Sequence, residues 1–144
     1  MVDHNLLVTL KEKFEAGSSE AKPDDLPLVL ELLKQLAVEN DEVKEELSGA
    51  DFKAVVEETE TGIKYWFTNK DGAVDYGEGE IDDPSFKFIG PLSVLAAIIF
   101  QEKDGPSAYM AGEISIEGNI ADGLAFNEVI AVSLDAFEDL IEDL

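Results

Sequence analysis

The sequence predicts an α+β fold, in which helices cover one face of a mainly antiparallel five-stranded sheet. Apolar residues recur at helical spacing up to Gly49 and at every second position in the segments that follow. Helical spacing returns from Pro91 and again after Asn119. Such runs of strands and helices are typical of α+β folds. The chain has 144 residues, of which 45% are hydrophobic, which is enough for one domain with a single core.

The first residues predict a short amphipathic helix over residues 3–15, because Leu6, Leu7, Leu10 and Phe14 share one side of such a helix. Residues 16–25 are small or polar and include Pro23, so we expect a linker. Residues 1–24 are therefore expected to form a helix and linker, and residues 25–144 the functional domain.

Two further helices are expected before the sheet. Asp25 suits an N-cap, and Pro27 would lie in the first turn, where its missing N–H is tolerated. A broad apolar stripe, which includes Val29 and Leu33, predicts that this helix continues to about Asn40. A second short helix is expected over residues 41–47.

Five strands are expected, and all but the third have the period of two that is typical of strands with one buried face. They are residues 52–57, 63–68, 73–79, 85–89 and 112–118. Asp71-Gly72 predicts a hairpin turn between the second and third strands. Trp66 is expected on the sheet face opposite to Tyr65 and Phe67.

The helices expected over residues 91–101 and 123–141 are apolar over most of their circumference. Residues 107–111 suggest one helical turn, and Asn119 suits a cap for the last helix. Helices of this kind must be covered on more than one side, by protein or by a ligand. Both explanations stay open at this point, because pockets and cores use the same residue types.

The charge excludes several functions. The chain has 33 Asp and Glu against 10 lysines and no arginine, and its net charge is -23. This field repels nucleic-acid phosphates and disfavours stable binding to anionic membranes.

There is no cysteine, and His4 is the single histidine. With no metal-ligand or cofactor motif and no basic leader, we expect a cytoplasmic protein without catalysis, metal or cofactor.

Three segments carry a resemblance to a known family: Phe86-Lys87-Phe88-Ile89-Gly90-Pro91-Leu92, Lys103-Asp104-Gly105-Pro106, and residues 108–119. In this order they resemble the sterol carrier protein type two domain. The Asp51-Phe52 segment followed by the hairpin at Asp71-Gly72 is similar to its prokaryotic stand-alone members. The similarity covers about residues 26–140. It implies a hydrophobic tunnel between the sheet and the helices, and non-enzymatic binding of sterols, fatty acids, fatty acyl-CoA or other lipids.

The chain departs from the family where a lysine is usual, because Glu113 stands there and neither Ser115 nor Glu117 is basic. This argues against acyl-CoA, so we expect a sterol-like lipid, a fatty acid or a prenyl lipid. The expected tunnel liners, each also suited to a core, are Phe52, Val56, Tyr65, Phe67, Phe88, Leu95, Ile99, Met110, Phe126, Ile130 and Phe137.

Two alternatives remain from the sequence. One is a protein-interaction or scaffold module with a filled core, for which Trp66 and residues 3–15 are the candidate contacts. The other is an accessory domain of a lipid-modifying enzyme. Pairs of acids such as Asp82 and Asp83 offer no catalytic site, because adjacent acids point apart and nothing predicts their desolvation.

Overall fold

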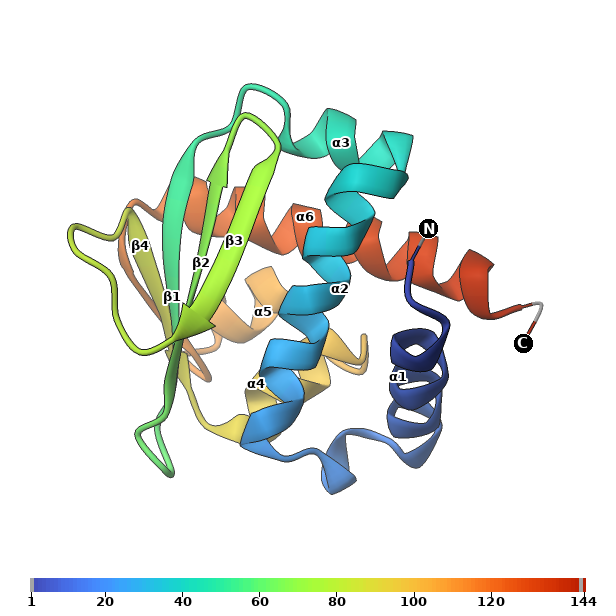
Figure 1. Cartoon of the computed structure of the whole chain (residues 1–144). Coiled ribbons are helices and arrows are strands. Elements are labelled where there is room, and N and C mark those ends of the chain that lie inside the picture. The colour runs from blue at the N-terminus through green and yellow to red at the C-terminus, as the bar shows by residue number, and fades with distance from the viewer. Residues whose placement is uncertain (1, 143) are drawn as a thin grey trace.

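The structure is a computed structural model that describes residues 2–142 and residue 144. Helices lie on one side of a sheet, and the long last helix crosses behind the strands (Figure 1). The helices are α1 (His4–Ala16), α2 (Leu26–Glu39), α3 (Asp41–Leu47), α4 (Leu92–Ile99), α5 (Gly105–Met110) and α6 (Ile120–Ile141). The strands are β1 (Phe52–Glu58), β2 (Lys64–Lys70), β3 (Ala73–Glu78), β4 (Phe86–Gly90) and β5 (Ser115–Gly118).

The five strands form one sheet in the order β3-β2-β1-β4-β5. Neighbouring strands are antiparallel except β1 and β4, which run parallel. Val56 in β1 pairs with Tyr65 on one side and Phe88 on the other, so these three side chains share the face that the helices cover. The predicted α+β fold with a mainly antiparallel five-stranded sheet is confirmed.

A cluster of aromatic rings fills one end of the space between the sheet and α6. The Phe126 ring lies 5.2 Å from Phe67 and 5.8 Å from Phe52, measured between ring centroids. Phe86 and Phe88 also pack on Phe126. Rings at these separations gain stability beyond their buried area. This end of the layer is therefore solid core.

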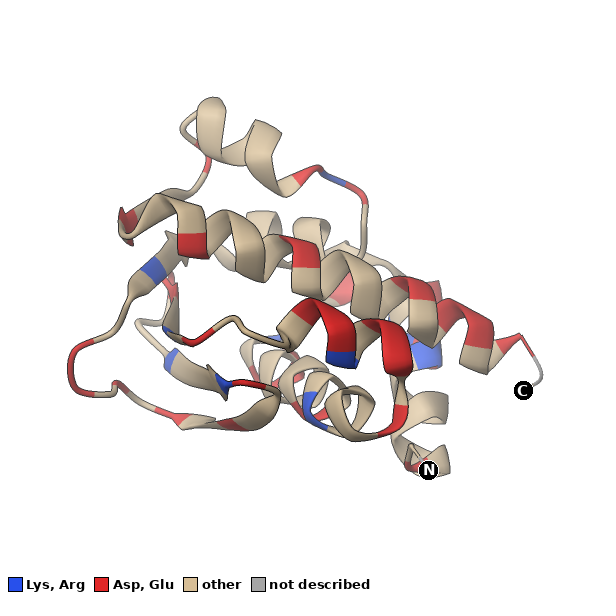
Figure 2. Cartoon of the chain, turned by 90° about the horizontal axis from the view of Figure 1, so that it is seen from above, with Lys and Arg blue, Asp and Glu red and all other residues tan. Residues whose placement is uncertain are grey.

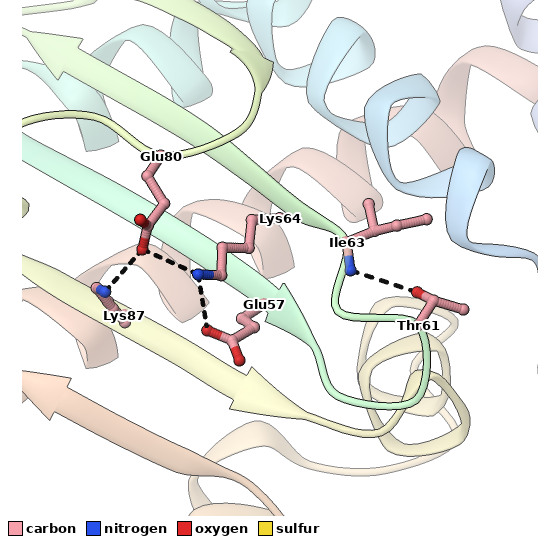
Figure 3. Close-up of polar contacts among 6 residues, drawn as sticks. All are labelled: Glu57, Thr61, Ile63, Lys64, Glu80 and Lys87. Carbon is pink, nitrogen blue, oxygen red and sulfur yellow. Dashed lines mark hydrogen bonds and ion pairs between the residues drawn. The ribbon is translucent and has the colours of Figure 1, made fainter.

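The outer face of the sheet carries an ion-pair network (Figure 3). Glu80 contacts Lys64 at 3.2 Å and Lys87 at 3.0 Å, and Lys64 also lies 3.8 Å from Glu57. Trp66 is half-buried on this outer face, opposite to Tyr65 and Phe67 as predicted. The role of Trp66 as a protein contact stays a prediction.

The N-terminal segment packs on the rest of the chain. Helix α1 buries Leu6, Leu7 and Leu10 in the same core as α2 and α6. The predicted linker contains two short 3-10 turns, Ser18–Glu20 and Pro23–Asp25, and Lys13 of α1 forms a 2.7 Å ion pair with Asp25. The proposed division at residue 24 stays a prediction.

Candidate functional site

Three hollows follow one another from the surface into the space between the sheet and the helices. The outermost, which we call the mouth, has a volume of about 290 Å³ and lies between the α4–α5 loop and α6. The outer cavity, about 40 Å³, is lined by Val56, Phe88, Leu95, Ile98, Ile99, Phe126, Asn127 and Ile130. The inner cavity, about 30 Å³, is lined by Leu26, Val29, Leu30, Leu33, Val56, Tyr65, Ile99, Phe126 and Ile130.

Shared side chains separate the three hollows. Ile98, Asn127 and Ile130 border both the mouth and the outer cavity. Val56, Ile99, Phe126 and Ile130 border both apolar cavities. Because Ile130 lines all three hollows, an apolar path leads from the mouth past Ile130 toward α2.

The path is narrow in this structure. A hollow of about 40 Å³ is well below the roughly 150 Å³ that accommodates a benzene ring in a protein core. The expected continuous tunnel is therefore not open here, and the row of small cavities marks its place. A long alkyl chain fits only if side chains that border both cavities, such as the half-buried Ile99 and Ile130, move aside.

Seven of the predicted liners border the two cavities: Val56, Tyr65, Phe88, Leu95, Ile99, Phe126 and Ile130. Their contact with a lipid stays a prediction. Phe52 and Phe67 instead belong to the solid aromatic core. Phe137 lies two turns beyond Ile130 on α6, where its ring packs 5.1 Å from Phe14.

Met110 does not line either cavity and is 85% exposed. Gly105 and Ala108 are the buried residues of this short helix, and Met110 lies two positions after Ala108, about 200° around the axis. Its side chain therefore leaves the buried face of α5.

The sequence did not assign the α2 side chains, Ile98 or Asn127 to the site. The apolar stripe of α2 was visible, but periodicity does not distinguish a cavity wall from a packed face. Asn127 had no sequence signal, because a single polar residue on an apolar helix is most often on the solvent side.

A buried carboxylate fixes the first turn of α4, the helix that supplies Leu95, Ile98 and Ile99. Glu58 is fully buried, and its Oε1 accepts hydrogen bonds from the backbone N–H groups of Glu60 at 2.8 Å and Leu92 at 3.1 Å. Oε2 accepts from the N–H and hydroxyl of Thr61. Burial alone would raise the pKa of Glu58, but these hydrogen bonds outweigh it and hold the pKa below its usual value.

The N-terminal segment holds the other end of α4. The Phe14 ring stacks on Phe100, which follows α4, with ring centroids 4.5 Å apart. Ser18 donates hydrogen bonds from its N–H and its hydroxyl to Glu102 on the edge of the mouth, at 3.0 and 2.6 Å. We call these contacts the clasp. Through the clasp, α1 restrains the loop that borders the mouth.

Acidic residues are spread over the helices and loops of the molecule (Figure 2). Glu102 and Asp104 contribute carboxylates to its lining. Lys103 is the one cation among the described lining residues, and its ammonium group already bonds Glu113. Asp104 accepts hydrogen bonds from the N–H and hydroxyl of Ser107. No helix of the described residues is long and apolar enough to cross a membrane.

The protein is a small α+β domain with a row of apolar cavities between its sheet and its helices. Residues 30–131 match the SCP-2 sterol transfer family, which is most of the chain. The protein belongs to this family, as the sequence motifs predicted, and the family supports lipid binding or transfer in general terms. Among curated proteins, no match was found.

Solved structures show the same fold at low sequence identity. A crystal structure of sterol carrier protein 2 has a TM-score of 0.58 and 17% identity over 73% of this chain and 92% of that one. The ubiquinone synthesis protein UbiJ-SCP2 gives a TM-score of 0.55 and 15% identity, over 77% of this chain and 99% of that chain.

A larger enzyme contains a similar fold. A double mutant of the sec-alkyl sulfatase PisA1 matches with a TM-score of 0.60 and 16% identity, over 79% of this chain. This chain corresponds to only 16% of the length of that sulfatase. At such identities, the likeness establishes the fold alone.

Proposed function

We propose that this protein binds and carries an apolar lipid without chemically changing it, with the chain of the lipid lying along the row of cavities. The observation that carries the proposal is the position of Ile130, which borders the mouth and both apolar cavities. Membership of the SCP-2 sterol transfer family supports the same class of ligand. Sterol-like lipids, fatty acids and prenyl lipids are the candidates.

Apolar burial supplies enough free energy for such binding. At roughly 0.8 kcal/mol for each buried CH₂, a chain of about 16 carbons gains on the order of 12 kcal/mol. Ordering the ligand and moving the side chains of the path subtract several kcal/mol. Micromolar binding is compatible with that difference. The same physics predicts weak discrimination of chain length, since one methylene contributes little.

The test combines lipid identification with a blocked path. Native mass spectrometry and denaturing extraction of the purified protein would identify a bound lipid. In parallel, a pyrene-labelled long-chain alcohol is titrated into the wild type and into Ile130→Phe. The larger ring at the centre of the path should weaken probe binding by about tenfold or more.

Leu124→Phe is the matched control, because Leu124 is also an aliphatic residue of α6 but is 40% exposed and lines no hollow of the path. It should bind the probe like the wild type. Equal binding by Ile130→Phe, or a wild type that neither retains a lipid nor binds the probe, would contradict the proposal. Thermal melts verify that both variants fold.

A second candidate function is a protein-interaction module with a filled core. The small volumes of the two apolar cavities, about 40 and 30 Å³, favour it. In that case neither extraction nor titration detects a ligand, and the half-buried Trp66 face or residues 3–15 would bind a protein.

A third candidate is an accessory domain of a lipid-modifying enzyme. The likeness to a segment of the sec-alkyl sulfatase PisA1 favours it. This candidate predicts that the chain stimulates a lipid-modifying enzyme when the two are mixed, which lipid transfer between vesicles would not require.

A further inference from the structure

Asn127 is the polar side chain at the boundary between the solvated mouth and the apolar path. It borders both the mouth and the outer cavity. Within residues 2–142 and 144, its amide has no hydrogen-bond partner. A half-buried amide without a partner in the protein retains both donors and its acceptor for a ligand or water.

The neighbouring Gly105 leaves the space that the Asn127 amide occupies. A Cβ atom at Gly105 would lie 2.1 Å from Oδ1 of Asn127, which is far closer than two such atoms can approach. The backbone of Gly105 is not in the left-handed region, so an alanine there has no conformational strain. Substitution of this glycine by alanine would therefore displace the Asn127 amide.

The charges at the mouth disfavour an anionic head group. The carboxylates of Glu102 and Asp104 line the mouth, and Lys103 is already bonded to Glu113. A lipid carboxylate or phosphate would face these acids without an unpaired cation nearby. The net charge of -23 adds a repulsive field over the whole surface. An uncharged hydroxyl or carbonyl avoids this repulsion and can bond an amide.

We infer that Asn127 binds the uncharged hydroxyl or carbonyl head of a lipid whose apolar chain enters the two cavities. This inference rests on the function proposed above and narrows it to neutral single-chain or sterol-like lipids with one hydrogen-bonding head. Asn127 thereby sets the direction of the ligand, with its polar end at the mouth and its chain toward α2.

Competition for the pyrene-labelled alcohol tests the inference with ligands that share a 12-carbon chain. They are dodecanol, dodecane, dodecanoate at about pH 8, where a fatty carboxyl is ionised, and dodecylammonium. The wild type should bind dodecanol more tightly than dodecane and far more tightly than dodecanoate. Tighter binding of dodecylammonium than of dodecanol would overturn the inference, because the acids and not Asn127 would then select the head.

Asn127→Leu and Gly105→Ala are the test variants. Each should weaken dodecanol binding by about 5- to 10-fold, the value of one hydrogen bond, and leave dodecane binding unchanged within about twofold. Gly105→Ala keeps the Asn127 side chain and only displaces it, so it tests the same contact if Asn127→Leu does not fold. Asn5→Leu, at an exposed position on α1, is the control and should behave like the wild type.

Two failures are distinguishable. If neither the probe nor any of the four ligands binds the wild type, the proposed function fails and the inference fails with it. If the probe binds but both test variants keep the wild-type ratio of dodecanol to dodecane affinity, lipid binding stands and the inference about Asn127 is overturned.

Discussion

Glu58 is a charged residue that the fold has completely buried, and its environment explains why. Four hydrogen bonds to its two oxygens join the turn after β1 to the first N–H of α4. Hydrogen bonds to an ionised group are stronger than those between neutral groups. This side chain therefore positions α4, which forms one wall of both apolar cavities.

Replacing Glu58 should destabilise the protein in a pH-dependent manner. Glu58→Gln loses charge-assisted hydrogen bonds, and its amide NH₂ group would face backbone N–H groups that need an acceptor. We therefore expect it to lower the free energy of unfolding by about 2–3 kcal/mol at about pH 7. Because the folded-state pKa of Glu58 is lowered, its stabilisation is fully present above the unfolded-state pKa. It disappears as the pH falls through the folded-state pKa.

Urea unfolding at about pH 7 and at about pH 3.5 measures this difference. The difference in the free energy of unfolding between the wild type and Glu58→Gln should be smaller at the lower pH. Glu60→Gln, an exposed position in the same turn, should change stability by less than about 0.5 kcal/mol at either pH. A difference in free energy of unfolding that grows toward low pH would contradict a lowered pKa of Glu58 in the folded protein.

At the scale of elements, α4 is held at both ends by parts of the chain remote in sequence. Its first turn is bonded to Glu58, and Phe100 just beyond its last turn stacks on Phe14 of α1. Helix α1 lies outside residues 30–131, the segment that matches the family. The clasp therefore joins a helix outside the matched segment to residues inside it, beside the mouth.

Phe14→Ala should loosen α4 selectively. Phe14 is half-buried, so we expect a loss of about 2 kcal/mol, below the roughly 3–5 kcal/mol of a fully buried phenylalanine. Hydrogen exchange of the amides in the last turn of α4 should accelerate more than exchange in the sheet. Leu7 is on the same helix but has no ring contact to Phe100. Leu7→Ala should therefore accelerate amide exchange in α4 and in the sheet to a similar extent. Equal effects of the two variants would contradict a specific clasp.

At the scale of the whole molecule, the acidic surface opposes folding through self-repulsion. Figure 2 shows acidic residues on the helices and loops with few lysines between them. Ion pairs such as those of Glu80 with Lys64 and Lys87 compensate only locally, because 33 acids face 10 lysines.

Added salt should therefore stabilise this protein. Raising NaCl from about 10 mM to about 300 mM screens repulsion between surface charges over distances longer than about 6–10 Å. We expect the Tm to rise by roughly 3–6 °C, equivalent to about 1–2 kcal/mol for a chain of this length. Differential scanning calorimetry measures the shift. A Tm that falls with NaCl would indicate that the ion pairs, and not the repulsion, dominate.

The sequence by itself determined the order of helices and strands, the helix-facing side of β1, β2, β4 and β5, and the family. Local periodicity, caps and turn residues such as Asn119 and Asp71-Gly72 carry that information. Only the tertiary structure decided which apolar side chains fill space and which border a hollow. Phe67 and Ile130 are both apolar residues at periodic positions of the sequence. In the structure, Phe67 lies in the solid cluster of aromatic rings, whereas Ile130 borders the path that begins at the surface. That difference depends on the fit between remote segments, which no local pattern encodes.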